Sequence, residues 1–418
     1  MKNSGVEWIG EIPENWEVKR GKELFFEIND RCKNPENYPL LSVSEYYGVA
    51  PKSEKIDEGD FITHAETLDG YKICQEGDIV QNIMLAWKRA TGMSNYEGLI
   101  SPAYCIYRPF KGVDSKYYHY LFRTDVYADL FKQFSTGIID SRLRLYPAKF
   151  LSLKYAYPPK STQQRIASYL DKKCSKIEET IQNQQQVIEK LKAYKQSLIT
   201  EAVTGKIKIQ NEILDFKYCN LSFIAEFKNG LNYNASDFGT EVKFLGVGDF
   251  QNYLVLNDES MFSNIITDTE IEDDYYLKNG DIIFVRSNGS KELVGRAIMV
   301  DNIDFKVTYS GFCIRLRNKE PQKINSKFLL YFFRSDHFRN ELQRLSQGSN
   351  ISNINQDLLS HIKIPLVEMR FQESVIDFLN KKCTAIDTAI EQKQNLIEKL
   401  TEYKKSLIYE CVTGKKEI

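Results

Sequence analysis

The phrase EKLKAYKQSLITEAVTGK occupies residues 189–206, and the closely similar phrase EKLTEYKKSLIYECVTGK occupies residues 398–415. The similarity extends upstream of both phrases with a constant offset. Aligning residues 164–206 with residues 373–415 gives 21 identities in 43 positions without a gap. Chance does not produce such a match, so the chain carries an internal duplication.

Both copies place apolar residues at alternating steps of four and three, the spacing of a coiled-coil seam. The seam of the first copy is Leu170, Cys174, Ile177, Ile181, Gln184, Ile188, Leu191, Lys195, Leu198 and Ala202. The seam of the second copy is Leu379, Cys383, Ile386, Ile390, Lys393, Ile397, Leu400, Lys404, Leu407 and Cys411. Each run ends in Val-Thr-Gly, where glycine can adopt the left-handed conformation that stops a helix. We expect two helices of about 43 residues, each roughly 65 Å long.

The two helices are expected to pack on each other, because one helix with an exposed apolar stripe would aggregate. About 160 residues separate them, and a compact domain of that size has its ends close together. The second helix would then begin beside the end of the first and run back antiparallel. The alternative is that each helix is buried separately in its own domain.

The segments before the two helices also resemble each other. Gly77–Val80 corresponds to Gly280–Ile283, a turn that enters a strand, and YCIYRP (104–109) corresponds to FCIRLR (312–317), a second strand. KYYHYLFRTD (116–125) matches KFLLYFFRSD (327–336), whose aromatic spacing indicates a buried helix. The order is therefore globule, helix, globule, helix, an α+β fold with two mixed α/β globules and pseudo-twofold symmetry.

Composition indicates a soluble multidomain protein. The chain has 418 residues, of which 42% are hydrophobic and 27% charged, and its net charge is −1. No apolar run approaches the roughly 18 residues of a membrane span, and the acidic start does not resemble a signal peptide, so we expect a cytoplasmic location. The eight cysteines form no CxxC pair, which gives a metal site little support.

Motifs for catalysis are not found in the sequence. There is no phosphate loop, no HExxH, and no Asn- or Asp-Pro-Pro-aromatic clamp for a flipped base. We expect the polypeptide to be non-catalytic. Two related but divergent globules held on stiff helices would instead suit two separated places on duplex DNA.

Several characteristic phrases are spread over nearly the whole chain: GVEWIGEIPENWEV (5–18), GDIVQNIMLAW (77–87), SPAY (101–104), YPPKSTQQRIASYLDKK (157–173), NGDIIFVRSN (279–288) and both VTGK endings. In these phrases the chain resembles the specificity subunits of Type I restriction-modification systems. The resemblance implies two target-recognition domains separated by two long antiparallel helices in a coiled coil, each domain recognising one half of a bipartite asymmetric DNA site. The corresponding ranges are a leader at 1–16, recognition domains at 17–160 and 208–366, and helices at 161–207 and 367–418.

The resemblance also implies partners and their cofactors. In this family the helices set the spacing and dock two modification subunits, which carry S-adenosylmethionine and methylate adenine in a prokaryotic cytoplasm. Restriction subunits, which use ATP and magnesium, join to translocate and cut DNA. No cofactor is expected in this chain itself. One departure is that the proline-rich YPPKSTQQR before the first helix weakens to IPLVEMRFQE (364–373), although Gln163 and Gln372 still align.

Loops that combine basic and amide side chains are the candidate DNA contacts, because Arg and Lys suit guanine edges and Asn and Gln suit adenine edges. These loops are WKRATG (87–92), STGIIDSRLRLY (135–146), RSNGSK (286–291) and QGSNISNINQ (347–356). The candidates are Lys88, Arg89, Ser141, Arg142, Arg144, Arg286, Asn288, Lys291, Asn350 and Asn353. The plainer interpretation is that they are turn-forming or solvated side chains. We expect Trp87 in the core.

Three other functions share some of these features. A coiled-coil scaffold would use its globules to bind proteins instead of DNA. A self-contained restriction enzyme would need a catalytic centre, and the acidic pair Asp273–Asp274 resembles loop surface more than such a centre. A specificity subunit of a Type IIB-like system would differ only in its neighbouring subunits.

Overall fold

The computed structural model describes residues 1–53, 68, 70–207, 209, 216–232, 239–250, 254–268, 270–289, 293–345 and 353–418. The chain divides into two compact units. Unit 1 comprises residues 1–184 and 395–418, and unit 2 comprises residues 185–394. Each unit therefore holds one globule together with part of both long helices, α5 (Lys160–Val203) and α9 (Met369–Val412).

The globule of unit 1 is built on an antiparallel four-stranded sheet in the order β4-β11-β8-β9. Its strands are β4 (Phe25–Ile28), β8 (Ile79–Asn82), β9 (Thr91–Met93) and β11 (Tyr104–Pro109). The antiparallel pairs around it are β1 (Lys2–Asn3) with β2 (Glu11–Ile12), β3 (Glu17–Arg20) with β12 (Lys154–Tyr157), β5 (Leu41–Ser44) with β6 (Gly48–Pro51), and β7 (Lys72–Cys74) with β10 (Gly98–Ile100). The helices are α1 (Gly21–Leu24), α2 (Ser115–Phe122), α3 (Asp125–Gln133) and α4 (Pro147–Ser152).

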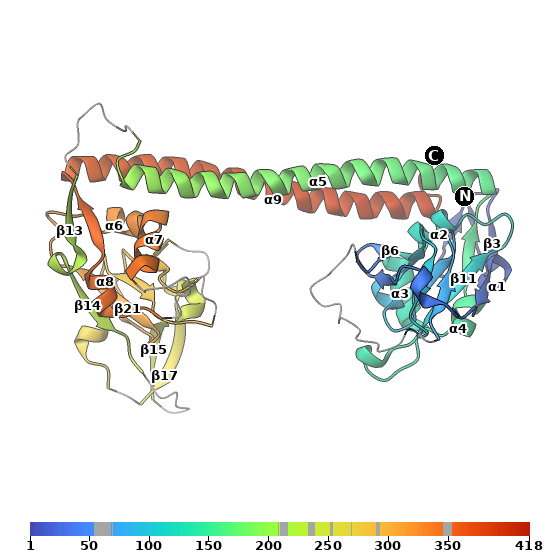
Figure 1. The fold of residues 1–418 in the computed structure, drawn as a ribbon, viewed down its shortest axis with the longest axis horizontal. Coiled ribbons are helices and arrows are strands. Elements are labelled where there is room, and N and C mark those ends of the chain that lie inside the picture. The colour runs from blue at the N-terminus through green and yellow to red at the C-terminus, as the bar shows by residue number, and fades with distance from the viewer. Residues whose placement is uncertain are drawn as a thin grey trace. The chain divides into compact units, whose positions relative to one another are not determined.

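The globule of unit 2 has a five-stranded sheet in the order β14-β21-β18-β19-β16 and a three-stranded sheet in the order β17-β15-β20. The strands are β14 (Ala225–Asn229), β15 (Thr240–Leu245), β16 (Val255–Leu256), β17 (Ser263–Thr267), β18 (Ile282–Val285), β19 (Ala297–Val300), β20 (Val307–Tyr309) and β21 (Cys313–Asn318), and β13 (Lys217–Asn220) pairs with β22 (Lys363–Leu366). The helices are α6 (Ser326–Phe333), α7 (Asp336–Leu345) and α8 (Gln356–Ser360). Figure 1 shows α6 between this sheet and the long helices, and one apolar core includes residues of all three.

The paired long helices run antiparallel within each unit, as the sequence predicts. In unit 1 Lys404 of α9 pairs with Glu178 of α5, and in unit 2 Lys195 of α5 pairs with Asp387 of α9 at 2.7 Å. The seam residues Leu170, Cys174, Ile177, Ile188, Leu198, Leu379, Cys383, Ile386 and Leu407 are buried, and Ile181, Leu191, Ile390, Ile397 and Leu400 are half-buried. In the described part of the chain, no helix combines the length and apolarity needed to cross a membrane.

Buried glutamines attach the start of each long helix to its globule in the same way. The Gln163 amide donates to the Pro158 carbonyl at 2.7 Å, and its oxygen accepts from the Asp114 backbone N–H at 2.8 Å. Gln372 donates to Val367 at 2.8 Å and accepts from the Asn325 N–H at 2.8 Å. The two helix starts are thus equivalent despite the loss of the proline pair.

Left-handed glycines stop both long helices, as predicted from the Val-Thr-Gly endings. Gly205 has φ +72°, and a side chain there would meet the Phe216 ring at 2.3 Å. Gly414 has φ +73°, and a side chain there would meet Pro13 at 2.5 Å. Pro13 of the N-terminal leader therefore packs against the end of α9, and Phe216 packs against the end of α5 in the same way.

The structural correspondence between β11 and β21 is shifted by one residue from the correspondence expected from the sequence. Arg108 pairs with Asp78 at 2.9 Å, and Arg317 pairs with Asp281 at 2.6 Å, directly before the equivalent strands β8 and β18. Arg317 is thus the counterpart of Arg108, whereas the alignment of YCIYRP with FCIRLR places Leu316 opposite Arg108. That alignment was wrong because the shared Cys-Ile dipeptide lies one position apart in the two strands, and a one-residue shift exchanges their faces.

Candidate nucleic-acid interface

Two candidate loops of unit 1 form one surface. The Leu145 N–H donates to the Ile83 carbonyl at 2.9 Å, which joins the end of the second loop to the strand end that precedes Trp87. Lys132 of α3 pairs with Asp140 at 2.9 Å, and its ammonium lies 4.8 Å from the centre of the Trp87 ring. The segments 87–92 and 135–146, far apart in sequence, are therefore neighbours.

The candidates on the first of these loops have different environments. Lys88 is exposed, with its ammonium 5.3 Å from the centre of the Trp87 ring. Arg89 adopts the left-handed conformation, φ +66°, and forms an ion pair with Asp125. Trp87 itself is half-buried, and its indole N–H donates to the Met84 carbonyl at 3.0 Å, so one side of the ring faces the core cluster.

The second loop, residues 135–146, is a turn whose two ends are joined by backbone hydrogen bonds. Thr136 and Arg144 exchange backbone hydrogen bonds of 2.9 and 3.0 Å, and Leu143 and Leu145 are buried beneath them. A side chain at Gly137, whose φ is +156°, would meet the Arg142 carbonyl at 2.6 Å. Ser141 and Arg142 are exposed, whereas Arg144 is half-buried and donates to the Leu143 carbonyl at 2.9 Å.

In unit 2 the candidates Arg286, Asn288 and Asn353 are brought together. Ser287 forms an antiparallel bridge with Asn353, and the Ile354 N–H donates to the Arg286 carbonyl at 2.9 Å. The Arg286 N–H in turn donates to Phe312, whose side chain is 62% exposed. Lys291 and Asn350 lie outside the described residues.

Large exposed apolar side chains at these loops were missed in the sequence. Ile138 is 100% exposed, Ile139 52% and Tyr146 49%, and Phe312, which accepts a hydrogen bond from the Arg286 N–H in unit 2, is also exposed. The signal was present as an isoleucine pair between the polar segments STG (135–137) and DSR (140–142), but an apolar pair in a sequence is normally assigned to the core.

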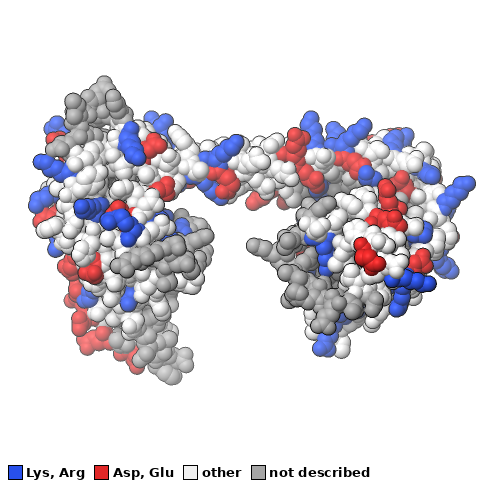
Figure 2. All heavy atoms as spheres, viewed as in Figure 1, with Lys and Arg blue, Asp and Glu red and all other residues white. Residues whose placement is uncertain are grey.

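Charge does not by itself mark either surface. On the face shown in Figure 2, Lys and Arg are interspersed with Asp and Glu over the described part of both units. This mixing agrees with the net charge of −1. Any nucleic-acid contact must therefore depend on local geometry, because bulk charge supplies no long-range attraction.

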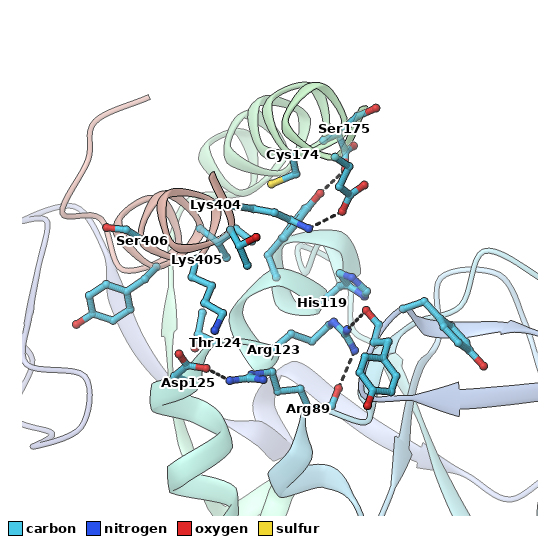
Figure 3. A pocket seen from close by; sticks show the side chains of 18 of the residues that line it. Arg89, His119, Arg123, Thr124, Asp125, Cys174, Ser175, Lys404, Lys405 and Ser406 are labelled. Carbon is cyan, nitrogen blue, oxygen red and sulfur yellow. Dashed lines mark hydrogen bonds and ion pairs between the residues drawn. The ribbon is translucent and has the colours of Figure 1, made fainter. Parts of the chain in front are cut away.

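A pocket of about 1220 Å³ lies in unit 1 between α2, the start of α3, α5 and α9. Figure 3 shows Lys405 reaching from α9 toward Thr124 and Asp125. Many of the charged side chains that line the pocket form ion pairs with each other. Lys116 pairs with Asp171 at 2.6 Å, Lys404 pairs with Glu178, and Asp125 pairs with Arg89.

Neither His119 nor Cys174 of this pocket suits acid–base or nucleophilic chemistry near neutral pH. Burial lowers the pKa of His119 to about 3, with Arg123 and Lys116 adding to the effect, so the imidazole is neutral. Burial raises the pKa of the Cys174 thiol to about 11, so the nucleophilic thiolate is scarce. The pocket walls provide packing and paired charges.

Of the acidic pair Asp273–Asp274, Asp274 forms ion pairs within the globule of unit 2. Asp274 accepts from Lys228 at 2.5 Å and from Arg315, whose side chain is fully buried in β21. The hydrogen bond from Lys228 lowers the pKa of the Asp274 carboxyl. Among the described residues, no group of three or more His, Cys, Asp and Glu side chains could hold a metal ion.

Comparison with known proteins identifies relatives along nearly the whole chain. The family model described as "Type I restriction modification DNA specificity domain" matches residues 202–401. The Type I restriction enzyme StySPI specificity subunit of Salmonella potsdam is 26% identical, with 97% of this chain and 90% of that protein covered.

Two solved structures share the fold. A chain from a study of complex assembly and conformational transition of the type I R-M system has a TM-score of 0.71 at 12% identity, covering 96% of this chain and 98% of that one. The HsdS subunit from Thermoanaerobacter tengcongensis has a TM-score of 0.57 at 14% identity, covering 97% and 98%. With its duplicated units and antiparallel helices, this chain is similar along 97% of its length to a specificity subunit of Type I restriction-modification systems, and its residues 202–401 match the DNA specificity domain of that family.

Proposed function

We propose that unit 1 and unit 2 each recognise one half of a bipartite, asymmetric DNA site. The observation that carries this proposal is that the same scaffold occurs twice with different loops. Both units repeat the buried glutamine, the Asp–Arg pair before the central strand, and the left-handed glycine. The candidate DNA-contacting loops, 87–92 and 135–146 in unit 1 and 286–291 and 347–356 in unit 2, have unrelated sequences. A repeated scaffold with divergent loops suits two readers of different sequences.

Two kinds of contact are assigned to the candidate side chains. Arg142, Arg286, Asn288 and Asn353 are exposed or half-exposed and are assigned to base edges, together with Lys291 and Asn350. Lys88, Arg89, Ser141 and Arg144 are assigned to phosphates, which position the protein without specifying sequence. Arg89 would have to exchange its Asp125 partner for a phosphate.

The long helices are assigned two tasks, namely docking two modification subunits and setting the gap between the half-sites. The support is that the two copies repeat their interhelical charge pairs, Lys195 with Asp387 and Lys404 with Glu178. S-adenosylmethionine would be bound by the modification subunits, and ATP and magnesium by the restriction subunits, with none in this chain. Such a complex would work in the cytoplasm of a prokaryotic cell, where its DNA is.

Methylome sequencing tests the proposal. A cell that expresses this chain with its cognate modification subunit should carry adenine methylation at one bipartite asymmetric motif, and a cell that expresses the modification subunit alone should not. Methylation that does not depend on this chain would contradict the proposal. Assembled complex that fails to shift DNA but retains other protein partners would favour the scaffold alternative.

A further inference from the structure

The apex of the closed turn at residues 135–146 places an apolar side chain entirely in solvent. Ile138 is 100% exposed and Ile139 is 52% exposed, although isoleucine is among the residues most often buried in folded proteins. Leu143 and Leu145 of the same turn are buried. The turn thus buries its leucines in the globule and presents its isoleucines outward.

Backbone hydrogen bonds within the turn hold its apex in place. The Thr136–Arg144 hydrogen bonds close the base, and the Arg142 and Leu143 N–H groups donate to Ile139 at 2.8 Å and Asp140 at 3.3 Å inside the turn. Gly137, which has no room for a side chain, allows the two segments of the turn to approach closely. Holding the isoleucines this way lowers the ordering entropy that a contact would otherwise cost.

The surroundings of the apex suit a polyanion. Arg142 is exposed beside it, Arg144 lies at the base, and Lys132 and Lys88 flank the neighbouring Trp87 ring. The acidic residue of the turn, Asp140, is already paired with Lys132. An apolar tip with Arg142 beside it and Arg144 at its base resembles the apolar wedges of proteins that insert an isoleucine, leucine or phenylalanine between base steps while cations hold the phosphates.

We propose that Ile138, supported by Ile139, inserts between stacked base pairs of the half-site recognised by unit 1. The inference rests on the proposed DNA-reading function and adds a mechanism to it. The insertion partly unstacks the duplex at one step and kinks it. The target adenine must leave the base stack before the modification subunit can methylate it. Unstacking beside this adenine lowers the free energy needed to extrude it.

The test uses the full chain assembled with its modification subunit and a duplex carrying the methylome-defined site. The adenine analogue 2-aminopurine, which fluoresces more when unstacked, replaces in turn each adenine in and next to the unit 1 half-site except the adenine that is methylated. Wild type should raise the fluorescence several-fold at one step. Ile138→Ser should abolish that rise and weaken binding about tenfold without changing the salt dependence, because no phosphate contact is lost. Ile138→Leu should retain both properties.

Ile266→Ser is the matched control, because Ile266 is a 43% exposed isoleucine of β17 in unit 2. It should leave the fluorescence of the unit 1 half-site unchanged. Ile138→Ser with wild-type fluorescence and affinity would overturn the inference while the DNA-reading function stands. Ile138→Ser that weakens assembly with the modification subunit in the absence of DNA would identify a protein-docking residue instead. A wild-type complex that binds no site would overturn both proposals.

Discussion

Gln163 and Gln372 show how much a single buried side chain contributes to this architecture. Each is fully buried, and each uses both ends of its amide to join the first turn of a long helix to the N-terminal cap of a globule helix. Asp114 and Asn325, whose backbone N–H groups donate to these glutamine oxygens, also cap α2 and α6 with their own side chains. The angle between helix and globule therefore depends on a few hydrogen bonds.

Replacing Gln163 by leucine should lower the free energy of unfolding by about 3 kcal/mol, because the Asp114 N–H and the Pro158 carbonyl would be buried without partners. Urea denaturation monitored by circular dichroism measures the change. The control is Gln164→Leu, the same substitution at the adjacent exposed position, which should change stability by less than about 0.5 kcal/mol. Equal effects at both positions would show that the buried amide is unimportant.

His119 makes a pH-dependent contribution to stability. Its pKa falls from 6.5 to about 3 in the folded chain, so below pH 6.5 the unfolded state binds the extra proton. Stability is therefore lost as pH falls, by up to about 1.4 kcal/mol per pH unit from this side chain. His119→Asn keeps an acceptor for the Met93 N–H and should lose stability less steeply between about pH 6.5 and about pH 5. Parallel pH profiles for the two proteins, measured by urea denaturation, would contradict this account.

At the scale of elements, the sequence predicts periodic features well and sheet register poorly. The seam spacing and the Val-Thr-Gly endings locate both helices and their stops, because these signals are local. The counterpart of Arg108 was misplaced by one residue, because the conserved-looking Cys-Ile dipeptide misled the alignment. The feature that fixes the register is an ion pair with Asp78 or Asp281, 30 or more positions away, and residue spacing alone does not reveal such a contact.

Two of the four polar interruptions of the seam, Lys195 and Lys404, form interhelical ion pairs that favour one register of the helix pair. Lys195→Glu would place a like charge opposite Asp387 and should lower the free energy of unfolding. The loss should not exceed about 1 kcal/mol, because both side chains are partly exposed. Adding Asp387→Lys should restore most of that loss. A double-mutant cycle of unfolding free energies measures the coupling. The control is the pair Glu189 and Lys192 within α5, whose exchange should leave helix pairing unchanged.

If Lys195→Glu and Asp387→Lys were strictly additive, the pair would not contribute to register. The same cycle on Lys404 and Glu178 in unit 1 should give a similar coupling energy, because the two pairs occupy equivalent positions of the duplication. A coupling in one unit alone would show that the two copies have diverged in this respect.

At the scale of the whole molecule, the duplication predicts two recognition units but not the surface of either. The contact between the loops at 87–92 and 135–146 passes through Lys132 of α3, whose placement depends on tertiary packing. The exposure of Ile138 likewise depends on a turn that closes through Thr136 and Arg144. Residue type identifies plausible DNA contacts, whereas only the fold shows which of them share a surface.

The independence of the two readers is the central claim, and methylome sequencing of a domain exchange tests it most directly. Residues 17–155 would be replaced by the first recognition domain of a Type I specificity subunit that recognises a different motif, and the hybrid chain would be expressed with the same modification subunit. The methylated motif should change in one half only, with the second half preserved. A motif altered in both halves would contradict the account, because it would show that the two units do not recognise DNA separately.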